Sequence, residues 1–257
     1  MPAMLAPNRF KRGLAAGTPQ IGFWLNLASP TVAEVCAGAG FDWLLIDMEH
    51  SPNELPDVVH TLRACEGGTA EPVVRVPWND AVTVKRLLDQ GARSFLFPFV
   101  QGAEEARRAV AATRYPPKGI RGFAGTTRAN HYARVADYAK RAEDEICVLV
   151  QTETRKAVGE IEAIAGVEGL DGIFIGPADL AADMGHIGNT QHQDVQAAIL
   201  DAGARIKRAG KAPGFLSLRE DETRKVLASG FAFVAVGTDV ALLVRQVDAL
   251  AQKFKGG

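Results

Sequence analysis

Short runs of consecutive apolar residues recur along the chain, and longer segments of mixed apolar and polar residues separate them. A run of four or five apolar residues fits a strand that is covered on both faces, as in a parallel sheet. The clearest run, residues 172–175, stops at Gly176 and Pro177, because proline cannot extend a sheet ladder. Eight such runs predict strands at residues 21–27, 43–47, 72–76, 94–98, 147–153, 172–176, 212–216 and 233–237.

The segments between these runs contain helix signals. Ser29 followed by Pro30 is typical of a helix start, with serine as N-cap and proline in the first turn. Glycine, which favours the position just past a helix end, precedes several strands. Residues 115–131 are the one long irregular stretch. Helices are predicted at residues 30–39, 55–65, 81–90, 103–113, 135–142 and 239–254, and others are expected on either side of the strand at 172–176.

Eight strands that alternate with helices in 257 residues predict an α/β fold of the (β/α)8 TIM barrel type. No shift in composition marks a boundary, so a single domain is expected over residues 1–257. A doubly wound sheet is the alternative. That fold would need a glycine-rich phosphate turn after the first strand, and residues 27–30, Leu-Ala-Ser-Pro, do not form one.

Composition narrows the range of partners. The chain is 47% hydrophobic and 23% charged, with a formal net charge of −1 and no basic block. This profile argues against a nucleic-acid or membrane-surface role. Cys36, Cys65 and Cys147 lack the spacing of a metal site, so reduced thiols in a cytoplasmic protein are expected. No secretory leader and no membrane-spanning apolar run are expected either.

Polar residues follow several of the predicted strands at the end where a barrel has its active site. Asp47, Glu49 and His50 follow the second strand, Gln151 and Glu153 end the fifth, and Asp179 follows the sixth. Glu153 and Asp179 would lie on neighbouring strand ends. Carboxylates without cysteine or histidine suit Mg²⁺ or Mn²⁺ rather than zinc. The alternatives are a helix N-cap for Asp179 and a surface charge for Glu153.

Arg75 and His50 are the other candidates. Arg75 lies inside an apolar strand segment, and a buried arginine is costly unless it is paired. It could form a salt bridge with an acid on the barrel floor, or serve as a fixed donor to an oxyanion. His50 could act as a general base near neutral pH, although a loop histidine is more often plain polar surface. His60, His131, His186 and His192 have no role that the pattern indicates.

Two kinds of site are not indicated. No lysine is placed for a Schiff base inside the barrel, and no glycine-rich phosphate loop follows the seventh or eighth strand. Asp89 lies late in a predicted helix, just before Gly91. A helix end prefers cations, so the pattern alone gives Asp89 no role.

Five segments together resemble the HpcH/HpaI aldolase family. They occur in order between about Phe10 and Phe254, and jointly they are specific. The segments are Leu45–Asn53 (LIDMEHSPN), Pro72–Arg75 (PVVR), Tyr115–Gly122 (YPPKGIRG), Val150–Thr154 (VQTET) and Phe174–Leu180 (FIGPADL). The resemblance implies a (β/α)8 barrel and a class II pyruvate aldolase that depends on a divalent metal, Mg²⁺, Mn²⁺ or Co²⁺.

The resemblance also implies roles for individual residues. Glu153 and Asp179 resemble the metal ligands of the family, and His50 resembles its catalytic base. Asp89 resembles the acid that raises the basicity of that histidine, and Arg75 resembles the transition-state stabiliser. Four substrate contacts are implied as well, at Arg75, Gln151, Ala178 (through its backbone) and Asp179.

The implied reaction is reversible retro-aldol cleavage of a 4-hydroxy-2-oxo acid to pyruvate and an aldehyde, with oxaloacetate decarboxylation as a possible side reaction. The implied assembly is a homo-oligomer, a hexamer built as a trimer of dimers, with the C-terminal helix exchanged between subunits. That helix has one apolar stripe at helical spacing, equally compatible with packing on its own barrel. The stripe comprises Val240, Leu243, Val244, Val247, Leu250, Ala251 and Phe254.

The chain departs from the family pattern at Met48, where a small residue is expected, and at residues 123–127. Both departures bear on the aldehyde rather than on the pyruvate half. The main alternative is a CoA-dependent lyase of the citrate-lyase β type, for which no basic adenine-phosphate site is found. A phosphate-binding isomerase and a non-catalytic barrel are further alternatives. The isomerase would need the phosphate loop that is missing, and a non-catalytic barrel would not keep His50, Arg75, Glu153 and Asp179 together.

Overall fold

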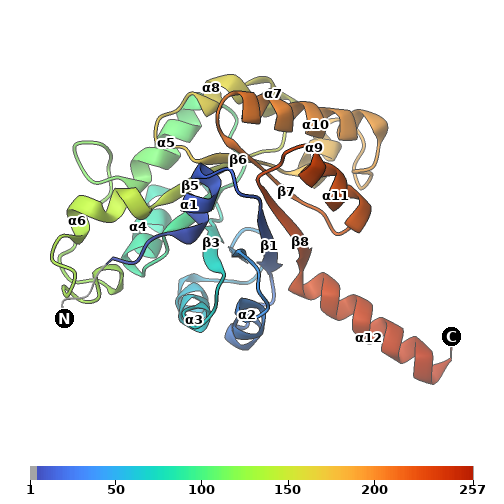
Figure 1. Cartoon of the computed structure of the whole chain (residues 1–257), viewed down its shortest axis with the longest axis horizontal. Coiled ribbons are helices and arrows are strands. Elements are labelled where there is room, and N and C mark those ends of the chain that lie inside the picture. The colour runs from blue at the N-terminus through green and yellow to red at the C-terminus, as the bar shows by residue number, and fades with distance from the viewer. Residues whose placement is uncertain (1–4, 257) are drawn as a thin grey trace.

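The computed structural model describes residues 5–256 and shows these residues forming a closed barrel of eight parallel strands (Figure 1). Each strand pairs with the next in the chain, and β8 pairs with β1 to close the ring. The predicted TIM barrel is therefore confirmed. The strands are β1 Gln20–Leu25, β2 Trp43–Asp47, β3 Glu71–Arg75, β4 Ser94–Phe97, β5 Cys147–Thr152, β6 Gly172–Ile175, β7 Ala212–Leu216 and β8 Phe233–Thr238.

Helices between the strands cover the outside of the barrel (Figure 1). The Ser29 hydroxyl caps the first of the predicted helices by accepting a hydrogen bond from Val32 N–H, as serine does at an N-cap. The α-helices are α1 Arg9–Ala15, α2 Pro30–Ala37, α3 Leu55–Cys65, α4 Ala81–Asp89, α5 Ala103–Thr113, α6 Tyr138–Arg141, α7 Arg155–Gly159, α8 Ile161–Ala165, α9 Pro177–Asp183, α10 Gln193–Arg208, α11 Glu220–Ala228 and α12 Asp239–Lys255. Two short 3₁₀ helices are η1 Arg128–Asn130 and η2 Ala142–Glu145.

Two apolar layers hold the barrel. One lies between strands and helices, and the other fills the barrel interior, as is usual for this fold. In the interior layer Phe10 of α1 contacts Trp43 and Phe233, with ring centroids 5.6 and 5.8 Å apart. Gly22 and Gly214 make room for these rings, because a Cβ at either position would lie 2.1 Å from the Trp43 or Phe233 ring. Helix α1, which the sequence did not predict, closes the amino-terminal end of the barrel.

One further difference from the sequence expectation concerns a helix. The helix predicted at residues 135–142 is shorter and later, with α6 and η2 covering residues 138–145.

For α12 the sequence left two arrangements open, and the structure shows that its apolar stripe does not pack on its own barrel. Asp239 is the buried residue of this helix. The large apolar residues of the stripe are 39–78% exposed, from Val240 at the lowest to Phe254 at the highest. Figure 1 shows α12 extending away from the barrel.

Asp239 anchors that projecting helix. Its carboxylate accepts hydrogen bonds from Asn26 N–H at 2.9 Å and Leu27 N–H at 3.1 Å, both just past β1. The helix is thus held at its first turn while the rest extends into solvent. None of the helices in residues 5–256 combines the length and apolar character that crossing a bilayer requires.

Candidate active site

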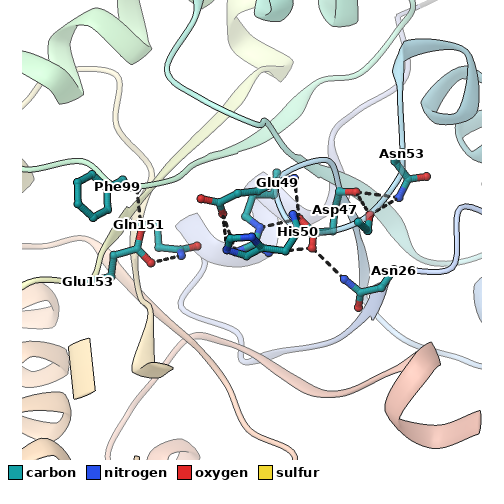
Figure 2. Close-up of polar contacts among 10 residues, drawn as sticks. Asn26, Asp47, Glu49, His50, Asn53, Phe99, Gln151 and Glu153 are labelled. Carbon is teal, nitrogen blue, oxygen red and sulfur yellow. Dashed lines mark hydrogen bonds and ion pairs between the residues drawn. The ribbon is translucent and has the colours of Figure 1, made fainter. Parts of the chain in front are cut away.

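Asp47, the last residue of β2, is the centre of a hydrogen-bond network at the carboxyl end of the barrel (Figure 2). The Arg75 guanidinium donates to both of its carboxylate oxygens, Nε to Oδ1 and Nη2 to Oδ2, at 2.8 Å each. Strand pairing aligns Asp47 directly with Arg75 on β3. Asn26 Nδ2 adds a third bond to Oδ2 at 2.8 Å. Two parallel bonds to a carboxylate hold a planar guanidinium in one orientation.

The turn after β2 wraps around the same residue. The backbone N–H groups of Glu49 and His50 donate to Asp47 Oδ1 at 3.1 and 3.5 Å. Asn53 Nδ2 donates to the Asp47 carbonyl oxygen at 2.7 Å, and the Ser51 hydroxyl donates to the same oxygen. Asp47 thereby holds the turn through hydrogen bonds to both its side chain and its backbone carbonyl. The turn fixes the positions of Glu49 and His50.

Arg75 is buried between two acids and an aromatic ring. It is 4% exposed, and its guanidinium carbon lies 4.4 Å from the Trp24 ring centroid. Its Nη1 is 2.9 Å from Glu49 Oε2, an ion pair whose angle falls outside hydrogen-bond geometry. The acids that pair with Arg75 lie at the carboxyl end of the barrel rather than on its floor. Burial raises the Glu49 pKa to about 7, against the lowering effect of Arg75, and Asp47 and Asp179 add to the rise.

Glu153, just past the end of β5, is buried, with 2% exposure, and is therefore not a surface charge. Its Oε1 accepts a hydrogen bond from Phe99 N–H at 2.8 Å, and its Oε2 accepts one from Gln151 Nε2. Burial raises the Glu153 pKa to about 7, with further contributions from Asp179 and Glu49, whereas the two hydrogen bonds lower it. The groups that oppose the raised pKa of Glu153 are thus the neutral Gln151 amide and the Phe99 backbone N–H, and no cation is among them.

Gly176 leaves the space that the Glu153 carboxylate occupies. A Cβ at this position would lie 2.5 Å from Glu153 Oε2 and 2.9 Å from Glu153 Cβ. Both contacts are closer than real Cβ atoms approach, so a side chain here would displace the carboxylate. Glycine is therefore required just past the end of β6, because Glu153 lies beside it just past the end of the neighbouring strand β5.

Asp179 lies in the first turn of α9, with its side chain exposed. The residue at the N-cap of α9 is Gly176, which makes no side-chain capping bond, so Asp179 is not the N-cap. Ala178, the residue before it, is exposed in the same turn. Backbone N–H groups in the first turn of a helix have no partner within the helix. This turn thus presents a free carboxylate beside backbone donors.

The carboxylates of Glu49, Glu153 and Asp179 lie close enough at the carboxyl end of the barrel to affect one another electrostatically. Asp179 raises the pKa of both Glu49 and Glu153, which places negative charge from two strand ends and one helix start together. Gln151 Oε1 is buried and, within residues 5–256, has no hydrogen-bond partner. Oxygen donors with uncompensated negative charge are what Mg²⁺ and Mn²⁺ prefer. The residues present fit a hard divalent cation.

His50 and Asp89 are not brought together within one chain. The His50 side chain is 65% exposed, with Nε2 3.9 Å from Glu49 Oε2. Figure 2 shows it with Asp47 and Glu49, across from Gln151 and Glu153. Asp89 ends α4, at the barrel end where β4 begins, and accepts a hydrogen bond from Arg121 Nη2 at 3.1 Å. Barrel topology thus places these two residues at opposite ends of the strands.

Sequence reasoning noted Asp47 and Glu49 as polar strand-end residues but gave neither a role. The Phe99 backbone N–H and Asn26 were not singled out at all. For Asp47 and Glu49 the sequence contains a signal, namely two acids separated by one residue at the end of a strand. Such residues lie on the same turn at the carboxyl end of the barrel. For Phe99 and Asn26 no local pattern indicates that they reach a residue on another strand.

Comparison with known proteins identifies relatives across almost the whole chain. The profile of the HpcH/HpaI aldolase/citrate lyase family matches residues 20–246. A 4-hydroxy-2-oxo-heptane-1,7-dioate aldolase from Klebsiella pneumoniae is 56% identical over 248 residues, which cover 96% of this chain and 94% of that protein.

Solved structures agree with this match. An HpcH/HpaI aldolase/citrate lyase family protein from Burkholderia cenocepacia superposes with a TM-score of 0.93 at 40% identity, covering 97% of this chain and all of that one. An HpcH/HpaI aldolase from Desulfitobacterium hafniense gives 0.88 at 31% identity, covering 96% of each chain. The similarity extends over the barrel as a whole and is not confined to the strand ends.

Proposed function

The chain belongs to the HpcH/HpaI aldolase/citrate lyase family and is an aldolase, and on that premise we propose its reaction and the residues that perform it. The reaction is reversible cleavage of a 4-hydroxy-2-oxo acid, such as 4-hydroxy-2-oxoheptane-1,7-dioate, to pyruvate and an aldehyde. The observation that supports this best is the cluster of Glu49, Glu153 and Asp179 beside Arg75, where two acids have a pKa near 7.

Glu153 and Asp179 would hold the divalent cation, Mg²⁺, Mn²⁺ or Co²⁺. When bound, such a cation supplies Lewis-acid stabilisation of charge on the substrate's keto oxygen. Gln151 supports Glu153 through its Nε2 and keeps its buried Oε1 free for the substrate or for water. The backbone of Ala178 would contact the substrate from the first turn of α9. Gly176 keeps the space for the Glu153 carboxylate open.

Arg75 would donate a hydrogen bond to the oxygen that becomes negative as the carbon–carbon bond breaks. Its Nε and one Nη2 hydrogen are engaged by Asp47, while Nη1 faces Glu49 outside hydrogen-bond geometry. A guanidinium has five N–H donors, so donors remain for a substrate. Because Asp47 fixes the fork before substrate arrives, little reorganisation is needed when charge develops.

His50 would take the proton from the C4 hydroxyl of the substrate. The C3–C4 bond then breaks, its electron pair passes into the enolate of pyruvate, and C4 leaves as the aldehyde. His50 would then deliver the proton it took from the hydroxyl to C3, which completes pyruvate and restores the neutral imidazole. In the reverse direction the same residue would return the proton to the new hydroxyl. The exposed side chain of His50 in the single chain leaves it accessible to substrate.

Asp89 can act on His50 only across a contact between copies of the chain, given their places at opposite ends of one barrel. The exposed stripe of α12 supports such an assembly, because single-chain packing leaves a row of large apolar side chains in water. We therefore retain a homo-oligomer, a trimer of dimers in which α12 is exchanged between subunits, as part of the proposal.

Charging the stripe should break this assembly. We expect the native chain to be oligomeric and the double variant Leu243→Glu with Leu250→Glu to dissociate into smaller species, because burying two new carboxylates opposes apolar contact. The control is Ala249→Glu with Gln252→Glu, which adds the same charge to the opposite face of α12. Size-exclusion chromatography with light scattering measures the mass. A monomeric, fully active native chain would contradict the assembly proposal.

Cation affinity should fall at acid pH. The raised Glu153 pKa of about 7 means that the metal-free carboxyl is protonated below that value, and a metal ligand must lose its proton. We expect Mg²⁺ affinity to weaken by about tenfold per pH unit below 7, measured by calorimetry between pH 8 and 5.5.

The stability of the metal-free protein should have the opposite trend. A raised folded-state pKa makes the folded chain bind its proton more tightly than the unfolded chain, so stability is lost as pH rises from about 4.5 through about 7. Thermal midpoints in chelator should therefore be higher at pH 6 than at pH 8. Glu153→Gln should remove part of this decline, and Glu49 should account for the rest. Midpoints independent of pH would contradict both shifts.

Pyruvate release tests the reaction itself. With Mg²⁺ and 4-hydroxy-2-oxoheptane-1,7-dioate, a lactate dehydrogenase-coupled assay should detect pyruvate without added CoA. Activity only on a CoA thioester would instead favour a lyase of the citrate-lyase β type. A panel of aldehydes condensed with pyruvate or hydroxypyruvate then identifies the preferred acceptor and donor.

A further inference from the structure

The loop between α9 and α10 brings together two histidines and an acid that the proposed reaction does not use. His186 follows α9, His192 is the N-cap of α10, and Asp194 lies in the first turn of α10. One potential ligand atom from each residue lies within 4.8 Å of the others. We propose that these three residues form a second metal site, selective for a transition cation such as Zn²⁺ or Ni²⁺.

The two imidazoles are already in contact. Their rings are stacked, with centroids 3.5 Å apart and planes 13° apart. His192 Nδ1 accepts a hydrogen bond from Asp194 N–H at 3.3 Å and lies 3.8 Å from Asp194 Oδ2. A neutral imidazole whose Nδ1 accepts a hydrogen bond carries its proton on Nε2, so a cation that binds His192 must displace either this bond or that proton. Each histidine is half-buried, whereas Asp194 is exposed.

Backbone bonds brace the loop that holds these side chains. His186 N–H donates to Ala181 O at 2.7 Å, and Asn189 N–H donates to His186 O at 2.8 Å. His192 N–H donates to Asn189 O at 3.2 Å. The two histidines are thus held near each other by the loop backbone. Binding of a cation would therefore cost less conformational entropy than binding to two independent side chains.

The donor set selects a different cation from the carboxylate site. Two imidazoles and one carboxylate suit Zn²⁺, Ni²⁺, Co²⁺ or Cu²⁺, whereas Mg²⁺ prefers oxygen ligands alone. With Zn–N bonds of about 2.1 Å, two nitrogens of a tetrahedral site lie about 3.4 Å apart, and the candidate ligand atoms here lie within 4.8 Å of one another. Binding requires the rings to open from their parallel arrangement so that their lone pairs converge. The exposed side of the loop admits water as the fourth ligand.

This site would lie past the C-terminal end of α9, the helix whose first turn contains Asp179. Helix α9 has seven residues, or about 10 Å of helix, with Asp179 in its first turn and His186 three residues past its end. A bound cation would join the loop after α9 to the first turn of α10. The expected effect is therefore on the stability of this segment. The inference does not depend on the proposed reaction.

Metal stoichiometry tests the inference. The full chain, without a polyhistidine tag, is titrated with Zn²⁺ and separately with Mg²⁺ in a calorimeter. We expect two Zn²⁺ per chain and one Mg²⁺. His186→Phe preserves ring stacking, and His192→Asn preserves an N-cap acceptor. Either variant should bind one Zn²⁺ and one Mg²⁺, whereas His60→Ala, an exposed histidine on α3, should still bind two Zn²⁺.

Glu153→Ala separates this proposal from the proposed function. It should lose Mg²⁺ binding yet keep one Zn²⁺, and that Zn²⁺ should disappear when His186→Phe is added. A single Zn²⁺ on the native chain together with none on Glu153→Ala would overturn the second site, as would two Zn²⁺ on both histidine variants. Failure of Glu153→Ala to lose Mg²⁺ would count against the catalytic ligand alone.

Discussion

Glu153→Ala and Asp179→Ala should each abolish Mg²⁺ binding and pyruvate release together. Each variant removes one of the two proposed metal ligands. The bound cation, as a Lewis acid, should lower the free energy of the transition state by at least about 4 kcal/mol, or roughly a thousandfold in rate. Calorimetry measures the binding, and the coupled pyruvate assay measures turnover. Chelation of the native enzyme should give the same loss, reversed by Mg²⁺, Mn²⁺ or Co²⁺.

Controls must show that the barrel still folds. Glu153→Gln retains the shape of the side chain and the Phe99 bond to an oxygen, so its fold should be intact while its metal binding is lost. Glu160→Ala removes an exposed carboxylate between α7 and α8 and should change neither property. Full turnover in a metal-free preparation would refute the class II mechanism. A borohydride-trapped pyruvate adduct on a lysine would point to a Schiff base instead.

The barrel was predictable because its signals are local. Strand β2, helix α3 and helix α5 have the bounds that the sequence predicted, and β6 ends before Pro177 as expected. Helix α1 was not predicted, since its seven residues have only Phe10 and Leu14 buried. Its place is determined by Trp43 and Phe233, which are distant in sequence and meet Phe10 only in the closed barrel.

For the site, the sequence indicated which residues lie at the strand ends but not what they contact. Arg75 had two possible partners in sequence terms, a floor acid or a substrate oxyanion, and the structure pairs it with Asp47 and Glu49 at the catalytic end. Register across β2 and β3 decides this, and no single strand reveals its register. Asp89 likewise has no visible link to His50 in one chain, and the link that the family resemblance implies would have to cross a contact between copies of the chain.

His50→Ala should reduce aldol cleavage by about 10² to 10⁴-fold, the usual contribution of a general acid–base residue. Metal affinity should change little, since His50 is not a proposed ligand. Deuterium exchange into the methyl group of pyruvate, which needs no aldehyde, should slow as well. His60→Ala is the matched control, because His60 is exposed on α3 and should leave every activity unchanged.

Oxaloacetate decarboxylation distinguishes a base from a structural residue. This reaction reaches the same enolate by losing CO₂, so no hydroxyl has to be deprotonated, and it should survive His50→Ala better than aldol cleavage does. Arg75 and the carboxylates would still serve it, because the turn after β2 is held by Asp47, Ser51 and Asn53 rather than by the His50 ring. If cleavage, exchange and decarboxylation all fall equally and Mg²⁺ affinity falls with them, His50 maintains the site and the base is another residue.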